Sequence, residues 1–172
     1  DATSLHDAKW IAQKCTHPIW WVEREYGLPV GSLKNKGNDE SAWMQGATVT
    51  SLGRRAKYGL IHTDRGDTMV FHLGMSGRWR IDPDDIGKHG HLVVETAGGT
   101  QLVLDDPRRF GSVDLVRTDA VDLYRGFVRM GPEPLDDQFT ARVLAQALEG
   151  RAAPIKAMLL DQRIVAGLGN IY

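Results

Sequence analysis

The chain has 172 residues, of which 42% are hydrophobic and 25% are charged, and its formal net charge is −1. This composition is typical of a globular protein with one or two small domains, and by itself gives no sign of a nucleic-acid partner. No apolar run is long enough to span a membrane, and no signal peptide opens the chain. The single Cys15 excludes an intramolecular disulfide and a multi-cysteine zinc site within this sequence, so we expect a cytoplasmic protein without membrane contacts.

The first 45 residues match no pattern that assigns them to a domain. Apolar spacing over residues 5–15 predicts one face of an amphipathic helix, and the polar, glycine-containing residues 31–41 predict a loop. Trp20 and Trp21 could pack against a neighbouring sheet. Residues 1–45 therefore stay unassigned, as a possible helix followed by a loop.

Residues 46–118 alternate apolar and polar residues in short runs separated by turn residues. Seven strands are predicted, at residues 47–51, 57–63, 68–73, 78–81, 91–96, 101–104 and 111–116. The Gly98-Gly99 pair predicts a hairpin turn between two of them. Strands this short and closely spaced favour an antiparallel sandwich or barrel, and we predict a β-sandwich domain.

The hydrophobic period becomes helical at residue 119, so we predict an α+β protein in which an all-α domain, residues 119–172, follows the sandwich. A first helix is predicted over residues 121–127, and Gly131 lies beyond its end. Asp136 or Asp137 would cap a second helix. Pro154 would start a third.

A glycine-rich double turn follows the third predicted helix. Gly167 and Gly169 permit a tight turn before the start of a further helix. The backbone N–H groups of such a turn, together with the amide of Asn170, would point at an anion. This pattern predicts a phosphate site.

The basic residues are clustered in spite of the neutral total. The clusters are Arg54, Arg55 and Lys57; Arg78 and Arg80; and Arg108 and Arg109. A local basic face is what phosphate binding requires, although isolated surface cations are usually only solvated.

Five motifs occur in the order seen in one protein family. They are Gly53-Arg-Arg-Ala-Lys-Tyr58, His72-Leu-Gly-Met-Ser-Gly77, Asp106-Pro-Arg-Arg-Phe-Gly111, Gly131-Pro-Glu-Pro-Leu135 and the last nineteen residues from Pro154 to Tyr172. Roughly residues 46–172 resemble the formamidopyrimidine-DNA glycosylase family, whose members excise oxidised purines from DNA. The resemblance implies a β-sandwich followed by a helix–two-turn–helix DNA-binding domain.

The resemblance assigns Met75, Arg108 and Phe110 to filling the void left by an extruded nucleotide and to contacting the orphaned base. Met suits an irregular gap, Phe can wedge between bases, and Arg can donate to a base edge. The alternative is that Met75 and Phe110 are core residues and Arg108 forms an internal ion pair. Their positions on glycine- and proline-flanked loops favour the DNA-reading role.

The resemblance also assigns Lys57, His72 and Asn170 to binding DNA phosphates. His72 alone on a strand would more often be structural. Lys156 matches a lysine that similar enzymes place near the damaged base, but a solvated lysine is almost as good an interpretation. The pair His89 and His91 has no third ligand close in sequence, so we predict no metal site there and no cofactor in this chain.

Two parts of the family's machinery have no counterpart in this sequence. The family's nucleophile is an N-terminal proline amine followed by a glutamate acid, whereas this chain begins Asp1-Ala2-Thr3. The family's zinc finger is also absent. We therefore expect a chain truncated at both ends, inactive as given, with damaged or abasic double-stranded DNA as partner and a monomeric state. A damage-binding module without chemistry is the alternative, and a structured-RNA binder is disfavoured because wedge residues serve duplex opening.

Overall fold

The computed structural model describes residues 19–23, 44 and 46–170, and these form two compact units. The first unit contains the described residues up to 53 together with residues 58–119. The second combines residues 54–57, the tip of a hairpin, with the chain from residue 120 onward.

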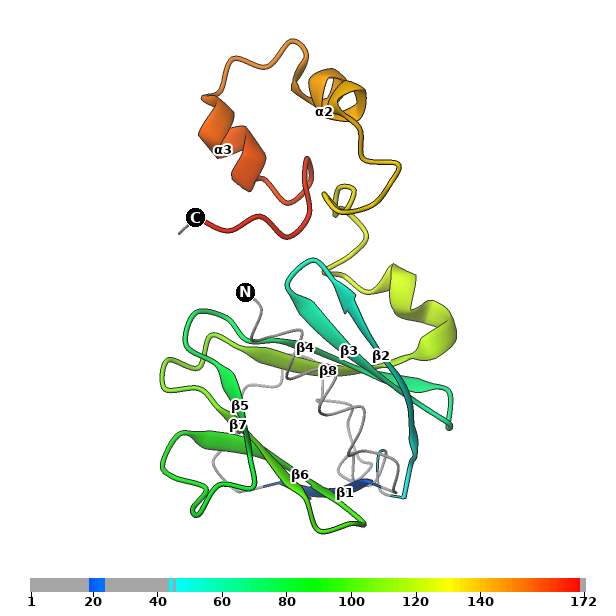
Figure 1. Ribbon diagram of the computed structural model, residues 1–172, viewed down its shortest axis with the longest axis vertical. Helices are drawn as coiled ribbons and strands as arrows, with labels where there is room; N and C mark the ends of the chain where they lie inside the picture. Colours follow the sequence, from blue (N-terminus) through cyan, green and yellow to red (C-terminus); the bar gives the residue numbers. More distant parts are fainter. Residues whose placement is uncertain (1–18, 24–43, 45, 171–172) are drawn as a thin grey trace. The chain divides into compact units, whose positions relative to one another are not determined.

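The first unit consists of two four-stranded sheets (Figure 1), with the strand orders β1-β6-β7-β5 and β2-β3-β4-β8. The strands are β1 Ile19–Glu23, β2 Val49–Arg55, β3 Tyr58–Thr63, β4 Asp67–His72, β5 Arg78–Ile81, β6 Gly90–Thr96, β7 Gln101–Asp105 and β8 Ser112–Arg117. Neighbouring strands pair antiparallel. All seven predicted strands form; the first extends to Arg55, and the others match to within one residue at each end.

The two sheets share one apolar core. Ile61 and Met69 from one sheet and Leu92 and Leu104 from the other belong to the same buried cluster. Leu92 and Val94 of β6, like Leu102 and Leu104 of β7, are alternate residues that belong to this core, which is why alternation in the sequence predicted these strands. The predicted antiparallel sandwich is confirmed.

Strand β1 was not predicted. It pairs with β6, with Trp20 opposite Glu95 and Val22 opposite Val93. A short run of apolar residues cannot be distinguished from a helix fragment by periodicity alone, which is why sequence reasoning missed it. The helix predicted over residues 5–15 lies outside the described residues.

The predicted helix over residues 121–127 is wrong. A 3-10 segment, η2 Thr118–Leu123, gives way to successive turns in which the N–H groups of Phe127 and Val128 both bond to the Tyr124 carbonyl. Leu123, which was expected to be buried, is 76% exposed. Gly126 lowers the helix propensity of this stretch, and no long apolar face compensates for it.

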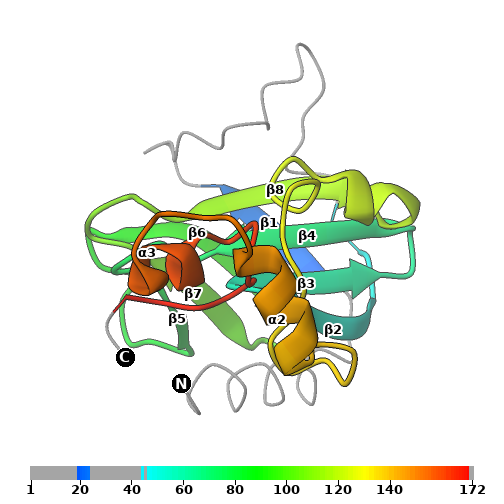
Figure 2. The ribbon, with the colours of Figure 1, turned by 90° about the horizontal axis from the view of Figure 1, so that it is seen from above.

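The second unit contains two short helices, α2 Ala141–Leu148 and α3 Ile155–Leu160, which lie beside each other in both views (Figure 2). Thr140, rather than either predicted aspartate, caps α2, because its hydroxyl accepts the Val143 N–H at 3.3 Å. Helix α3 starts directly after Pro154, as predicted. No helix among the described residues has the length and apolar character needed to cross a membrane.

Candidate functional site

Two loops of the first unit are joined by one buried carboxylate. They are residues 73–77, between β4 and β5, and residues 106–111, between β7 and β8; we call them the paired loops. The carboxylate of Asp106, only 1% exposed, accepts the Ser76 hydroxyl at 2.6 Å and the Gly111 N–H at 2.7 Å. The Ser76 hydroxyl oxygen in turn accepts the Arg108 N–H at 3.2 Å. Each loop therefore holds the other.

The hydrogen bonds to Asp106 also decide its charge. Burial raises the pKa of this carboxyl, but the hydroxyl of Ser76 and the backbone N–H groups of Gly111, Arg108 and Phe110 outweigh burial and hold the pKa below its usual value. Asp106 is therefore a carboxylate at neutral pH, which is the form that accepts these bonds.

Glycines allow the backbones of the paired loops to touch. Gly74 has φ +63°, and a Cβ on it would lie 2.6 Å from the Phe110 carbonyl carbon. A Cβ on Gly111 would lie 3.0 Å from the His72 carbonyl oxygen. A side chain at Gly74 would separate the loops, so the close approach of their backbones explains why the motif has glycine at this position.

The paired loops present three large side chains to solvent. Met75 is 72% exposed and Phe110 is 56% exposed. The guanidinium carbon of Arg108 lies 4.6 Å from the centroid of the Phe110 ring, a cation–π distance. Met75 and Phe110 are therefore not core residues, and Arg108 forms no ion pair with another described residue. The structure brings Arg108 and Phe110 together, on a loop joined to the one that carries Met75.

Of the three predicted phosphate-binding residues, His72 lies in the first unit. It is half-buried at the end of β4, where its Nδ1 accepts the Gly74 N–H at 3.0 Å and its ring packs against Tyr58 at 4.7 Å. The histidine therefore also supports the loop that carries Met75.

The other two phosphate candidates lie in the second unit, at the double turn. Lys57 is exposed, and its Nζ donates to the Leu168 carbonyl at 2.7 Å, while Asn170 is exposed at the end of the turn. Lys156 is exposed on the first turn of α3.

Sequence reasoning missed Gln162, the residue that shapes the double turn. Its side-chain amide donates to the carbonyls of Leu160 and Leu168, both at 3.0 Å, and its carbonyl accepts the Gly167 N–H at 2.8 Å. Gly167 has the predicted left-handed backbone, with φ +85°. The expectation that its N–H points at an anion is wrong, because Gln162 occupies that donor.

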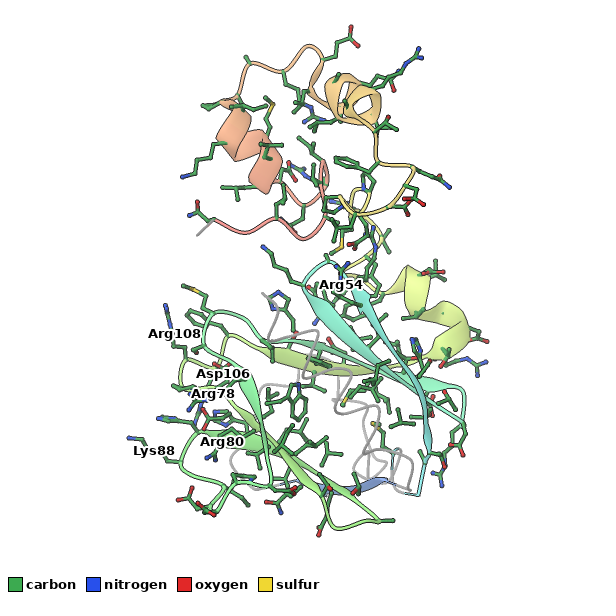
Figure 3. The ribbon with its side chains drawn as sticks, viewed as in Figure 1. Arg54, Arg78, Arg80, Lys88, Asp106 and Arg108 are labelled. Atoms are coloured by element: carbon green, nitrogen blue, oxygen red, sulfur yellow. The ribbon has the colours of Figure 1, made fainter. Side chains whose placement is uncertain are left out.

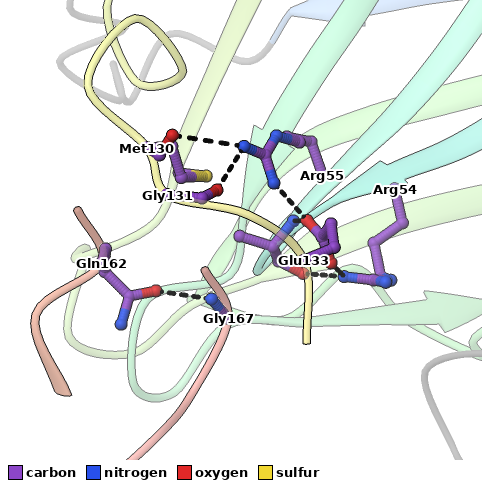
Figure 4. Close-up of polar contacts among 8 residues, drawn as sticks. Arg54, Arg55, Met130, Gly131, Glu133, Gln162 and Gly167 are labelled. Atoms are coloured by element: carbon purple, nitrogen blue, oxygen red, sulfur yellow. Dashed lines mark hydrogen bonds and ion pairs between the residues drawn. The ribbon is translucent and has the colours of Figure 1, made fainter. Parts of the chain in front are cut away.

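A second missed residue is Glu133, which binds the hairpin tip within the second unit (Figure 4). Its carboxylate accepts from Arg54 at 2.8 Å, from Arg55 at 2.7 Å and from the Ala56 N–H at 2.6 Å. Burial raises the pKa of Glu133, but these three donors outweigh it and hold the pKa below the usual value. Glu133 lies in one of the sequence motifs, which was the available signal. The basic pair Arg54 and Arg55 is thus partly neutralised.

The basic pair Arg78 and Arg80 is also partly structural. Figure 3 shows Arg78, Arg80, Lys88 and Arg108 on the same side of the sandwich. The guanidinium of Arg80 donates to the carbonyls of Asp85 and Ile86 and lies 3.7 Å from the buried Asp105 carboxylate. Arg78 is more exposed and lies 3.5 Å from the same carboxylate. Within the described residues, no group of three or more His, Cys, Asp or Glu could hold a metal ion.

Family models match both units. Residues 29–113 match the formamidopyrimidine-DNA glycosylase N-terminal domain, and residues 130–172 match the H2TH domain of the same family. The first match begins well before residue 46, so it includes residues that the sequence motifs left unassigned.

Curated relatives and solved structures give the same result. Formamidopyrimidine-DNA glycosylases of Rhizorhabdus wittichii and Novosphingobium aromaticivorans are 71% and 67% identical over 129 residues, which is 75% of this chain and 48% of each relative. The chain thus spans about half the length of the curated relatives that it matches. Lactococcus lactis Fpg in a complex with abasic-site DNA superposes with a TM-score of 0.84 at 30% identity, over 96% of this chain and 60% of that one. The same protein in a complex with FAPY-dG DNA superposes with a TM-score of 0.84 at 30% identity, over 96% of this chain and 62% of that one.

Proposed function

Because this chain belongs to the formamidopyrimidine-DNA glycosylase family, we propose that residues 46–170 recognise oxidised purines and abasic sites in double-stranded DNA. We propose a role for the protein in base-excision repair, in which the damaged base is removed and the strand is then cleaved at the abasic site. We propose that it works as a monomer on the DNA of the bacterial cytoplasm, and that the described residues act without a metal.

One observation carries this proposal: the paired loops, which the buried Asp106 carboxylate joins, expose a methionine, a phenylalanine and an arginine. Turning a nucleotide out of a duplex costs a few kcal/mol of stacking, which side chains offset by filling the vacated space. Met75 and Phe110 have the size and exposure for that role, and the guanidinium of Arg108 can donate to the orphaned base.

Phosphate contacts would hold the duplex while a base is extruded. We propose this role for Lys57, His72 and Asn170, and a contact near the damaged base for Lys156. Lys57 and Asn170 both lie at the double turn, which supports a shared role. Binding through such contacts should weaken as salt rises.

The test compares binding to a duplex carrying an abasic-site analogue with binding to the intact duplex. Arg108→Ala should reduce the preference for the damaged duplex by roughly five-fold or more, since an arginine–base contact contributes about 1–3 kcal/mol of discrimination. Phe110→Ala should act in the same direction. Arg65→Ala, at an exposed arginine in the β3–β4 turn, is the matched control and should leave the preference unchanged.

Lys57→Ala should have the opposite pattern. It should weaken binding to both duplexes equally and reduce the slope of log K against log salt by about one unit. If Arg108→Ala lowers the melting temperature and leaves lesion preference intact, Arg108 is a structural residue and the proposal loses its basis.

A second candidate function is binding without cutting. The Nζ of Lys57, the lysine among the proposed phosphate contacts, already donates to the Leu168 carbonyl at 2.7 Å, so this amine is occupied by the protein and is not poised to attack a sugar. We expect no covalent adduct when this 172-residue chain is incubated with abasic DNA and borohydride. A crosslink mapped to any residue of the chain would instead assign lyase chemistry to it.

A further inference from the structure

A β-bulge in β6 contains a buried histidine next to the paired loops. Gly90 pairs with Asp105 and Leu92 with Leu104, so at this point β6 holds one residue more than β7. The extra residue is His91, whose side chain is buried, with 7% of the residue exposed. Bulges are frequent beside functional sites because they turn a side chain out of the regular alternation.

The ring of His91 meets the first residue of the loop 106–111. Its Nε2 lies 3.0 Å from the Asp106 carbonyl oxygen. Because a carbonyl only accepts, the hydrogen bond requires the proton on Nε2. On the other side of the same residue, the Asp106 N–H donates to the His89 carbonyl at 2.9 Å. The stretch from His89 to His91 therefore binds both backbone polar groups of Asp106.

Asp106 is the point from which the loop turns outward. Its carbonyl also accepts the Arg109 N–H at 3.2 Å, and Arg109 has a left-handed backbone with φ +57°. A non-glycine residue holds this conformation only when its surroundings enforce it. The bond from His91 acts on the same carbonyl oxygen, directly below the displayed side chains of Arg108 and Phe110.

We propose that His91 is a positioning residue for DNA recognition. Its Nε2–H bond to Asp106 holds the loop 106–111 in the geometry that presents Arg108 and Phe110. This inference rests on the proposed function and adds to it a buried residue that acts through the loop. The other ring nitrogen, Nδ1, is buried without a hydrogen-bond partner among the described residues, so Nε2 is the atom through which the ring acts.

Three variants of the full chain separate positioning from packing. His91→Leu keeps an apolar side chain but removes the donor, whereas His91→Gln can place an amide N–H close to the position of Nε2. Thr96→Val is the matched control: Thr96 is 2% exposed at the far end of β6, and its hydroxyl accepts the Thr100 N–H at 3.1 Å. It removes one buried hydrogen bond from the same strand, away from the paired loops.

Amide hydrogen exchange without DNA gives the first measurement. In His91→Leu the Gly111 and Arg109 N–H groups should exchange roughly five-fold faster or more, as expected when one hydrogen bond that holds the loop is lost. The exchange rates of these two amides should be unchanged in Thr96→Val and close to those of the wild type in His91→Gln. Unchanged exchange at both amides in His91→Leu would overturn the proposal.

Lesion preference gives the second measurement, with the duplexes used for Arg108→Ala. His91→Leu should lower the preference for the abasic duplex by roughly five-fold and leave binding to intact DNA unchanged, and His91→Gln should restore it. Equal losses in His91→Leu and Thr96→Val would reduce His91 to a stability residue. If wild type shows no lesion preference, the proposed function fails, and exchange alone then decides whether His91 holds the loop.

Discussion

Each of the two units of this protein is stabilised internally by a different kind of interaction. The first buries large apolar side chains from both sheets, with Met69, Leu104 and Val94 each no more than 1% exposed. Among the described residues of the second unit, the buried apolar cluster is Met158, Ile164 and Val165, and helix α2 has no fully buried residue.

In the second unit, hydrogen bonds of polar side chains compensate for the small apolar core. Glu133 binds the hairpin tip through Arg54 and Arg55, and Gln162 binds three backbone groups around the double turn. Apolar packing contains no titratable group and so does not depend on pH, whereas the contribution of a carboxylate that accepts three hydrogen bonds does. The first unit should therefore behave as a rigid support, and the second should respond to its ionic surroundings.

The largest expected effect is in the sandwich core. Leu104→Ala should destabilise the protein by about 2–5 kcal/mol, because it leaves a cavity among side chains from both sheets. Leu123→Ala, at a leucine that is 76% exposed, should change stability by less than about 0.5 kcal/mol. Urea denaturation measures both. Similar effects for the two leucines would mean that the apolar core does not dominate the first unit.

The next effect concerns the polar clamp of the second unit. Glu133→Ala should cost about 2–3 kcal/mol, because Arg54, Arg55 and the Ala56 N–H lose their acceptor together. Exchange of amides in residues 130–168 should rise, while exchange in the sandwich core stays slow. Glu149→Ala, at an exposed glutamate, is the control. Uniform destabilisation of both units would contradict the division between them.

A steric effect of about 2 kcal/mol is expected at the contact between the paired loops. Gly74→Ala meets both a left-handed backbone and the Phe110 carbonyl carbon 2.6 Å away. Gly66→Ala has a similar backbone, with φ +77°, but no atom within 4 Å of its new Cβ, so it should cost only about 1 kcal/mol. The difference between their unfolding free energies isolates the loop contact. Equal costs would show that the loops yield to a methyl group without strain.

The smallest effect is the response to acid. The pKa of Glu133 in the folded protein lies below its value of about 4.3 in the unfolded chain. The contribution of Glu133 to the free energy of unfolding is therefore complete above that pH and is lost as the pH falls through the folded pKa. The pKa of Asp161, lowered to about 2 by Arg163, acts in the same direction. Amides of the second unit, and those of the paired loops that Asp106 joins, should lose protection before those of the sandwich core as the pH falls below about 4. Glu133→Gln should remove part of this dependence; an unchanged acid profile in that variant would exclude Glu133 as its source.

Sequence alone determined most of the local structure. Alternation predicted seven of the eight strands because each has one face on the core, and glycine positions marked the loops around Met75 and Phe110. The third helix followed from Pro154, and the family followed from short motifs in order. These are properties of contiguous residues, for which period and backbone freedom are sufficient information.

Tertiary structure decided which distant groups meet. The contacts of Asp106 with Ser76, of Glu133 with Arg55 and of His91 with Asp106 join residues that are 30, 78 and 15 positions apart. The hydrogen-bonding capacity of a residue is visible in the sequence, but its partner depends on how sheets and turns pack. For the same reason the N–H of Gly167, which the sequence-based prediction pointed at an anion, donates to Gln162 in the folded protein. A buried donor bonds to the nearest acceptor that the fold provides, and only the folded chain determines which one that is.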